Sequence, residues 1–484
     1  MKRKICLCMA GLLAVSLAGC SGSGSTKLLD PKNPITLTIW HYYNGNQQSA
    51  FDSLVDEFNE TEGKDKGIFI QSYSQGAVDS LEAAVMSSIK GEVGADEVPD
   101  IFSSYADTAY SIEEMGKLAD ITQYLSEEEL DEYVDAYIEE GRIAKDGSLR
   151  IFPVAKSTEI MMVNKTDWDA FANETGVTME ELATFEGVTK VAQQYYEWTD
   201  AQTPDIPNDG KAFYGRDSMA NYFVIGVRQQ GKEIFQADKG KVTLNIDKEY
   251  IRRLWDNYYI PYIKGYFASY GKFRSDDVKT GDLLAFTGSI TASMYFPDQV
   301  ETGTESYPID YAVLPAPVLE GGEPYMVQQG AGMVVSKSDE AHEFAAVTFL
   351  KWFTKAENNL KFACSSGYLP VKKEAVDKEK LDQVIAKDNL EIPEKTYDCL
   401  TSILGEENPD LLYTTKAFSS GFAARKVLDY NLSDKAAADR EVIKEALDKG
   451  GSLEEVCAPY LTEEAFDSWY EGFKDALTEI IEQK

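Results

Sequence analysis

The sequence predicts an α/β protein in which a parallel sheet is covered by helices. Short runs rich in β-branched and aromatic residues alternate with amphipathic helical stretches, and glycine or proline often marks the boundaries. Between residues 35 and 102 the order is strand, helix, strand, helix, strand. That order is typical of crossover units, which build parallel sheets.

The first strand is predicted at residues 35–40, where apolar residues and threonines alternate. A helix follows at 50–58, because its apolar residues recur at helical spacing while the acids fall elsewhere. Residues 68–70 predict the second strand, 80–90 the second helix and 99–102 the third strand. Later segments repeat this pattern: strands at 151–154, 160–163, 310–314 and 333–335, a helix at about 340–354, and largely helical chain from 376.

Residues 1–19 have the features of a signal peptide. A basic start at positions 2–4 precedes an apolar run that is too short to span a bilayer. Small residues directly before Cys20 resemble the bacterial lipoprotein signal, which implies cleavage after Gly19 and a lipid on Cys20. An ordinary secretory peptide with an incidental cysteine is the alternative. Residues 20–33 are Gly/Ser-rich at their start and predict a flexible tether.

The charge and composition exclude several classes of function. A formal net charge of −35 repels phosphate backbones and anionic lipid surfaces, so neither nucleic acid nor electrostatic membrane docking is expected. Hydrophobic residues make up 43% of the chain and aromatic residues 12%, which indicates a folded globule. Attachment to the membrane therefore depends on the lipid anchor.

Three cysteines remain after processing and lipidation: Cys364, Cys399 and Cys457. Their spacing fits neither a disulfide framework nor a zinc cluster. One disulfide with one free thiol, or three buried thiols, are both compatible with the sequence.

Signatures of enzymes are mostly missing. The chain has two histidines, His41 and His342, and no G-x-S-x-G elbow, P-loop or G-x-G-x-x-G, so no metal or cofactor is expected. Residues 87–90 match S-x-x-K and 279–281 match K-T-G, but the S-D-N element of penicillin-recognising enzymes is absent. Paired carboxylates for glycoside hydrolysis stay open, because 82 acids offer many pairs.

Landmarks along residues 34–480 occur in a recognisable order. The most specific block is 330–371, which contains Gly-Met-Val-Val-Ser-Lys, Ala-Ala-Val-Thr-Phe-Leu-Lys-Trp and Gly-Tyr-Leu-Pro-Val. Before it come the motifs at 99–102, 118–121, 151–154, 163–165 and 310–317. Together they resemble extracellular solute-binding protein family 1, the maltose-binding-protein-like lipoproteins that feed ABC sugar importers.

The resemblance implies a type II periplasmic-binding-protein-like fold: two α/β lobes, each a parallel-rich sheet with flanking helices, joined by a hinge. Lobe one would take residues 34–153 plus 331–375, and lobe two 154–330 plus 376–484. The two chain crossings would form the hinge, and the ligand would sit between the lobes.

Loop positions after strands, together with the resemblance, predict the ligand site. Tyrosine and tryptophan rings stack on the apolar faces of sugars, and the chain has 28 Tyr and 6 Trp. The predicted contacts are Trp40, Tyr42, Asn44, Tyr105, Asp107, Ser157, Tyr222, Tyr295, Gln329 and Gly330. Trp40 equally fits the buried face of its strand, and His41 is expected as a surface or hydrogen-bonded residue. The other five tryptophans are expected to pack on helices.

The sequence thus predicts a lipid-anchored, monomeric, non-enzymatic protein on the outer face of a bacterial cell membrane. It would capture a mono- or oligosaccharide and deliver it to an ABC permease. One alternative keeps the fold and changes the ligand to a phosphorylated polyol, a polyamine or a peptide. The alternative of a different class is a lipid-anchored glycan hydrolase.

Overall fold

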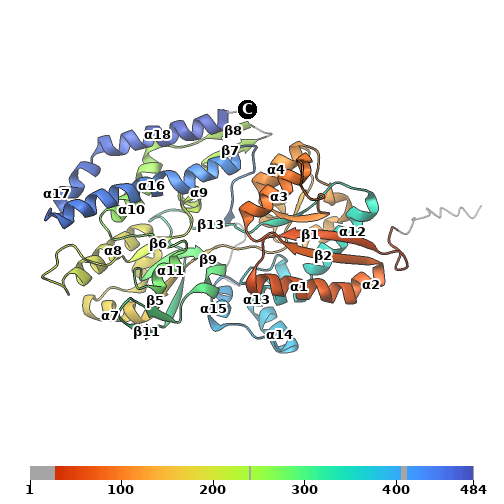
Figure 1. Ribbon diagram of the computed structural model, residues 1–484, viewed down its shortest axis with the longest axis horizontal. Helices are drawn as coiled ribbons and strands as arrows, with labels where there is room; N and C mark the ends of the chain where they lie inside the picture. The colour runs from red at the N-terminus through yellow and green to blue at the C-terminus, as the bar shows by residue number, and fades with distance from the viewer. Residues whose placement is uncertain (1–27, 239–240, 405–410, 483–484) are drawn as a thin grey trace, which may run out of the picture.

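The computed structural model describes residues 28–238, 241–404 and 411–482. The predicted signal peptide, Cys20 and residues 20–27 of the predicted tether lie outside the described residues. Among the described helices, none combines the length and hydropathy needed to cross a membrane. Figure 1 shows two α/β halves side by side, each built around its own larger sheet.

The first half is built on a five-stranded sheet. The three strands from the N-terminal part of the chain pair in parallel. The strand that returns from the second half pairs antiparallel with both of its neighbours. In spatial order the strands are β2 (Ile68–Ser74), β1 (Ile35–His41), β3 (Ile101–Ser104), β14 (Gly332–Val335) and β4 (Ile151–Phe152). The helices of this half include α1 (Gly45–Glu60), α3 (Val78–Lys90), α4 (Ala106–Glu114), α6 (Asp135–Gly141) and α12 (Glu340–Phe353).

The second half is built on a four-stranded sheet, with β12 (Tyr311–Pro315), β5 (Glu159–Asn164), β9 (Ala285–Ser289) and β6 (Tyr214–Arg216) in spatial order. Only β6 and β9 pair in parallel, and β5 runs antiparallel to both of its neighbours. This sheet is therefore mixed rather than parallel-rich as the sequence predicted. Strand β5 enters from the first crossing, and its neighbours β9 and β12 follow more than a hundred residues later, so the local strand–helix pattern did not determine their direction relative to β5.

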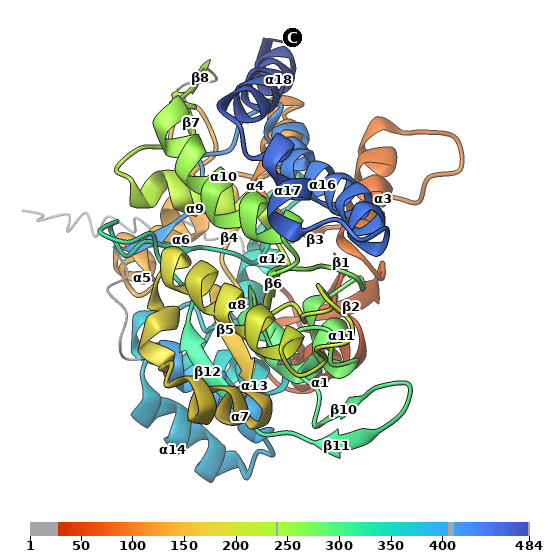
Figure 2. The same ribbon diagram turned by 90° about the vertical axis from the view of Figure 1, so that its left-hand side faces the viewer.

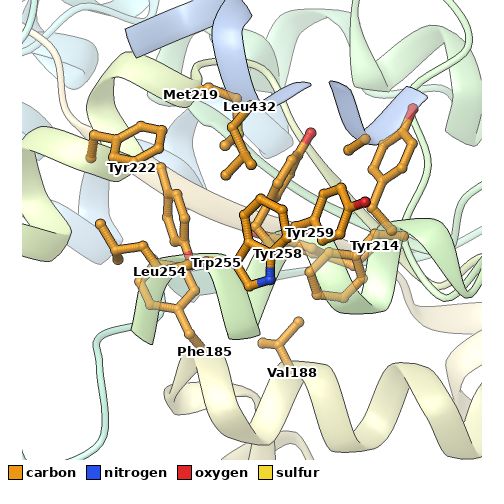
Figure 3. Packing of buried hydrophobic residues seen from close by; sticks show 14 of the residues in the cluster. Phe185, Val188, Tyr214, Met219, Tyr222, Leu254, Trp255, Tyr258, Tyr259 and Leu432 are labelled. Atoms are coloured by element: carbon orange, nitrogen blue, oxygen red, sulfur yellow. The ribbon is translucent and has the colours of Figure 1, made fainter. Parts of the chain in front are cut away.

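Helices with many aromatic residues surround the second sheet. Figure 3 shows Phe185, Tyr222, Trp255 and Tyr259 converging in this core, where Trp255 stacks on Tyr259 with ring centroids 3.7 Å apart. The helices are α7 (Lys165–Thr175), α8 (Phe185–Asp200), α9 (Met219–Gln229), α10 (Lys248–Ile263), α16 (Gly421–Asp448) and α18 (Glu463–Glu482). Figures 1 and 2 show α16 and α18 lying along α10. The five remaining tryptophans lie on helices and pack against cores, as predicted.

The other elements are short or peripheral. They are α2 (Glu62–Lys66), α5 (Glu127–Asp131), α11 (Arg274–Lys279), α13 (Ala356–Ser366), α14 (Lys378–Asp388), α15 (Glu394–Ile403), α17 (Leu453–Cys457), and the strand pairs β7 (Phe235–Asp238) with β8 (Lys241–Leu244), β10 (Gln299–Glu301) with β11 (Ser306–Pro308), and β13 (Met326–Val327) with β15 (Leu412–Tyr413). Helix α13 contacts α1 and also contributes to a core shared with the second sheet, so it packs against both halves.

Two chain crossings between the halves lie side by side. Ser157 and Gln329 exchange two backbone hydrogen bonds, with N···O distances of 3.0 and 2.9 Å. The Nζ of the buried Lys156 donates to Glu140 Oε2 at 2.5 Å and to the Gly330 carbonyl at 2.9 Å. Gly330 has a φ of +91°, and a Cβ there would lie 2.8 Å from the Ala155 carbonyl oxygen, so only glycine fits without strain. These contacts join both crossings to α6 of the first half.

The structure corrects the prediction for His41 and shows which of the two arrangements left open for the cysteines is present. His41 is neither on the surface nor hydrogen-bonded: it is fully buried between Tyr43 and Phe51, and neither ring nitrogen has a partner among the described residues. Burial lowers the pKa of His41 to about 4, although Asp52 opposes this effect. Cys364, Cys399 and Cys457 are buried free thiols, which is the second of the two arrangements that the sequence left open.

Candidate functional site

A cavity of about 340 Å³ lies between the two halves. The first half supplies one wall from α3 and from the start of α4, and α6 adds Glu140. The second crossing supplies Gln328, Gln329 and Gly330, and the first turns of α16 supply the opposite wall together with Asn221 from α9. The cavity is therefore lined by segments that are distant in sequence and belong to both sheets.

Helix α16 faces the cavity with one stripe of side chains. Phe422, Arg425, Lys426, Asp429 and Tyr430 line the cavity and recur at spacings of three and four residues, which places them on one side of the helix. On a neighbouring face of α16, Leu428 and Leu432 are buried in the core of the second half. The same periodicity thus fixes the helix in the core and aims a mixed polar and aromatic face at the cavity.

Three aromatic rings on the cavity wall are unusually exposed. Tyr105 is 39% exposed, Phe422 42% and Tyr430 55%. Large rings normally lose most of their surface on folding, because burial of apolar area is favourable. Rings left open from both walls of one cavity can instead stack on the apolar face of a ligand.

Planar polar groups and hydroxyls make up much of the remaining lining. Gln329 Oε1 is buried and has no hydrogen-bond partner among the described residues. Thr414 and Thr415 add hydroxyl groups beside it on the same cavity. Buried acceptors are nearly always paired in folded proteins, so Gln329 Oε1 is an acceptor that a bound ligand can satisfy.

Asp107 joins the two halves at the cavity wall. Its Oδ1 accepts a hydrogen bond from the backbone N–H of Phe418 at 3.4 Å. A Cβ at position 421 would lie 2.0 Å from this oxygen, so Gly421 is what allows α16 to approach. Burial raises the pKa of Asp107 to about 6, although the Phe418 hydrogen bond and Arg425 oppose the shift.

The other carboxylates of the lining already have partners within the protein. They are Asp79 with Lys426 at 4.0 Å, Glu82 with Thr108 at 2.7 Å, Glu140 with Lys156 at 2.5 Å and Asp429 with the backbone N–H of Ala220 at 2.7 Å. Asp79 and Glu140 are thus paired with cations, whereas Glu82 and Asp429 accept hydrogen bonds from neutral donors and keep their negative charge uncompensated.

Four of the predicted site residues line the cavity: Tyr105, Asp107, Gln329 and Gly330. Two more lie directly behind this wall. Ser157 is buried, and its Oγ lies 2.7 Å from Ser289 Oγ. Tyr42 is buried with its ring parallel to that of Tyr105 and with its hydroxyl 3.2 Å from the Tyr368 hydroxyl.

The structure does not bring the other four to this cavity. Trp40 lies in the core of the first half, and Tyr222 lies in the core of the second half with its hydroxyl donating to the Leu254 carbonyl at 2.9 Å. Asn44 is exposed, and its amide donates to backbone carbonyls. Tyr295 is 61% exposed; burial is the main cause that raises the pKa of Tyr368, and Tyr295 adds a small contribution.

Sequence reasoning missed the contributions of α16 and α9. Phe422, Arg425 and Tyr430 carry a helical spacing that the sequence displays, but the spacing alone does not reveal which side faces a cavity. Asn221 stands next to the predicted Tyr222, and the helical turn sends the two side chains in different directions.

A second cavity of about 330 Å³ adjoins the first and shares part of its lining. Ala106, Glu140, Gln328, Thr414 and Thr415 line both. The segment 414–415 follows β15, which pairs with β13 directly before the second crossing. This pairing fixes the segment that lies between the two cavities.

The sequence profile of the bacterial extracellular solute-binding proteins matches residues 53–391. The chain belongs to this family. A maltotriose-binding protein of Pyrococcus abyssi (strain GE5 / Orsay) is 24% identical over 353 residues, which are 70% of this chain and 67% of that protein. Family membership places the folded part of the protein outside the cytoplasm and agrees with the predicted resemblance.

Solved structures of similar fold cover nearly the whole chain. The cyclic α-maltosyl-1,6-maltose binding protein of Arthrobacter globiformis superposes with a TM-score of 0.65 at 18% identity, over 93% of this chain and 100% of that one. UgpB of Mycobacterium tuberculosis in complex with glycerophosphocholine has a TM-score of 0.64 at 16% identity, with the same two coverages. These likenesses confirm the predicted type II periplasmic-binding-protein-like fold.

Proposed function

We propose that this solute-binding protein captures a carbohydrate in the cavity between its halves and delivers it to an ABC permease. The observation that carries the proposal is the cavity wall itself. Exposed rings from both halves surround an unpaired amide oxygen, hydroxyls and a guanidinium, which together suit the apolar faces and hydroxyls of a sugar.

The similar proteins support this ligand class. The relative from Pyrococcus abyssi is named for binding maltotriose, and the structure from Arthrobacter globiformis for binding a cyclic maltosyl-maltose. The cationic side chains of Arg425 and Lys426 in the lining argue against a polyamine, because they would repel its ammonium groups.

Binding without turnover is part of the same proposal. Residues 34–153 plus 331–375 would move as one lobe and 154–330 plus 376–484 as the other, about the two crossings. A ligand held by both walls stabilises the closed arrangement, so binding shifts a population and makes or breaks no bond.

The N-terminal lipid on Cys20 and the tether at 20–33 would keep the protein at the outer face of the cell membrane. A short flexible tether raises the local concentration of a bound module at its partner without new contacts. The anchored protein would act as a monomer above its permease.

A thermal-shift screen of the mature chain carrying Cys20→Ser tests the proposal. Mono- and oligosaccharides, with maltotriose first, are compared with spermidine and glycerophosphocholine. A ligand present at 100 times its Kd stabilises the folded state by about 2.7 kcal/mol, so at least one carbohydrate should raise the Tm. Stabilisation by a non-carbohydrate alone, or sugar release from a glycan, would contradict the proposal.

A further inference from the structure

A continuous row of four polar side chains runs from the interior of the second half to the cavity. The Nη2 of Arg216 lies 2.9 Å from Glu159 Oε2. The Nδ2 of Asn221 donates to Glu159 Oε1 at 2.9 Å. The Nη2 of Arg425 donates to Asn221 Oδ1 at 2.7 Å. Glu159 is the first residue of β5, so this member of the row lies where the chain leaves the first crossing.

The buried part of this row is closed to solvent. The side chain of Arg216 is 3% exposed and that of Glu159 is 6% exposed, and Asn221 is fully buried. The Arg216 guanidinium also lies over the Tyr222 ring at 4.9 Å. A buried ion pair needs its remaining hydrogen bonds to be satisfied, and Asn221 provides one of them to Glu159.

The chemistry of its neighbours determines the orientation of the Asn221 amide. A carboxylate can only accept hydrogen bonds, so the NH₂ group of Asn221 must face Glu159. The carbonyl oxygen then points the other way, where it can only meet a donor, and the guanidinium of Arg425 is donor-only. The contact with Glu159 therefore sets which atom Asn221 presents to Arg425.

The backbone that carries Arg425 is fixed by a second contact one turn further along α16. Asp429 Oδ1 accepts from the backbone N–H of Ala220 at 2.7 Å and from Ser218 Oγ at 3.2 Å. Ser218 and Ala220 form the start of α9, where a negative charge is favoured. Arg425 and Asp429 thus attach the cavity face of α16 to the same turn of α9.

Arg425 has unused donors at the cavity. Asn221 is its one hydrogen-bond partner among the described residues, and the guanidinium has five N–H donors. Burial raises the pKa values of Asp107 and Tyr105 on the opposite wall, and the charge of Arg425 opposes that rise. A planar fork of this kind can donate two parallel hydrogen bonds to adjacent oxygen atoms.

We infer that Arg425 binds the sugar by donating to two of its adjacent hydroxyl oxygens, and that Asn221 and Glu159 are positioning residues that aim it. The inference rests on the proposed function, since it takes a carbohydrate as the occupant of the cavity. Glu159 does not line the cavity, and the amide of Asn221 is engaged by Glu159 and Arg425, so both residues act on the affinity through Arg425.

Calorimetric titration of maltotriose into the mature Cys20→Ser chain tests the inference through a double-mutant cycle. Arg425→Ala should weaken binding about tenfold or more, because hydrogen bonds from charged groups are lost. Asn221→Ala should weaken binding in the wild-type background and have no further effect in the Arg425→Ala background. Lys444→Ala, an exposed position on the same helix, is the matched control and should leave the affinity unchanged.

A merely structural role for Asn221 would give a different pattern. Its loss would then lower the affinity by the same factor in both backgrounds, and that result overturns the positioning role. Thermal unfolding is measured for each variant, and Asn221→Ser, which keeps a donor and an acceptor, replaces Asn221→Ala where folding is lost.

The outcomes separate this inference from the proposed function. If the wild type binds maltotriose and Arg425→Ala binds it equally tightly, the inference is overturned and the proposed function stands. Failure of the wild type to bind any sugar in the screen overturns the proposed function, and the inference with it.

Discussion

The contribution of Asp107 to the stability of the folded protein should depend on pH. Its carboxylate lies close to Gly421 and accepts a hydrogen bond from the Phe418 N–H, and burial raises its pKa from 3.8 to about 6. Between these two values the folded protein binds more protons than the unfolded chain. The contribution of Asp107 to stability is therefore complete below about pH 4, falls as the pH rises to about 6, and is constant above that.

Substitution of Asp107 by Asn should remove this pH dependence. The free energy of unfolding of the wild type relative to Asp107→Asn should fall by at most about 3 kcal/mol between pH 4 and 7, since one pKa unit corresponds to 1.36 kcal/mol. Urea unfolding of both proteins across this range measures the difference. A difference that does not vary with pH would show that Asp107 titrates normally.

Tyr430 should contribute to binding through its exposed ring. Removing a stacked aromatic ring costs about 0.5–1.5 kcal/mol beyond its area, so Tyr430→Ala should weaken binding of the sugar identified by the screen by a factor of about 2 to 13. Tyr270→Ala is the matched control, because Tyr270 is 70% exposed and does not line the cavity. Equal affinities of the two variants in a calorimetric titration would remove Tyr430 from the site.

Among single residues, the sequence correctly predicted cavity positions that lie at strand ends or at a chain crossing. Tyr105 and Asp107 come directly after β3, and Gln329 and Gly330 lie at a crossing, so strand ends and crossings located them. Trp40 and Tyr222 have similar local surroundings in sequence but lie in cores. Burial depends on residues far along the chain, and no local pattern reveals it.

At the scale of elements, the second crossing depends on a glycine. Gly330→Ala would place a Cβ 2.8 Å from the Ala155 carbonyl oxygen at a φ of +91°. We expect a loss of about 1–3 kcal/mol in unfolding free energy from backbone strain, plus the cost of the clash. Gly321→Ala is the matched control, since its φ of +71° is similar but nothing lies within 4 Å of the added Cβ. Denaturant unfolding giving equal losses would mean that the crossing tolerates the side chain.

The strands and helices near the N-terminus were predictable because their periodicity is local. The predicted strand at 35–40 and helix at 80–90 correspond to β1 and α3 within a few residues. Strand pairing was less predictable. The antiparallel pairing of β5 with β9 and β12 is decided by segments more than a hundred residues apart, which a reading of local pattern does not connect.

At the scale of the whole molecule, the order of motifs predicted the fold, and family membership confirms it. The shape of the cavity could not be predicted from the sequence. Its walls come from α3, α4, α9, α16 and a crossing, which come together only when the chain folds. Its ligand class is a proposal that depends on all of these walls together.

A crystal structure of the mature chain with the sugar selected by the thermal-shift screen tests the central claim most directly. The account predicts the sugar in the cavity between the halves, stacked on Tyr105, Phe422 or Tyr430 and donating a hydroxyl to Gln329 Oε1. A sugar bound elsewhere on the protein, with this cavity unoccupied, would contradict it.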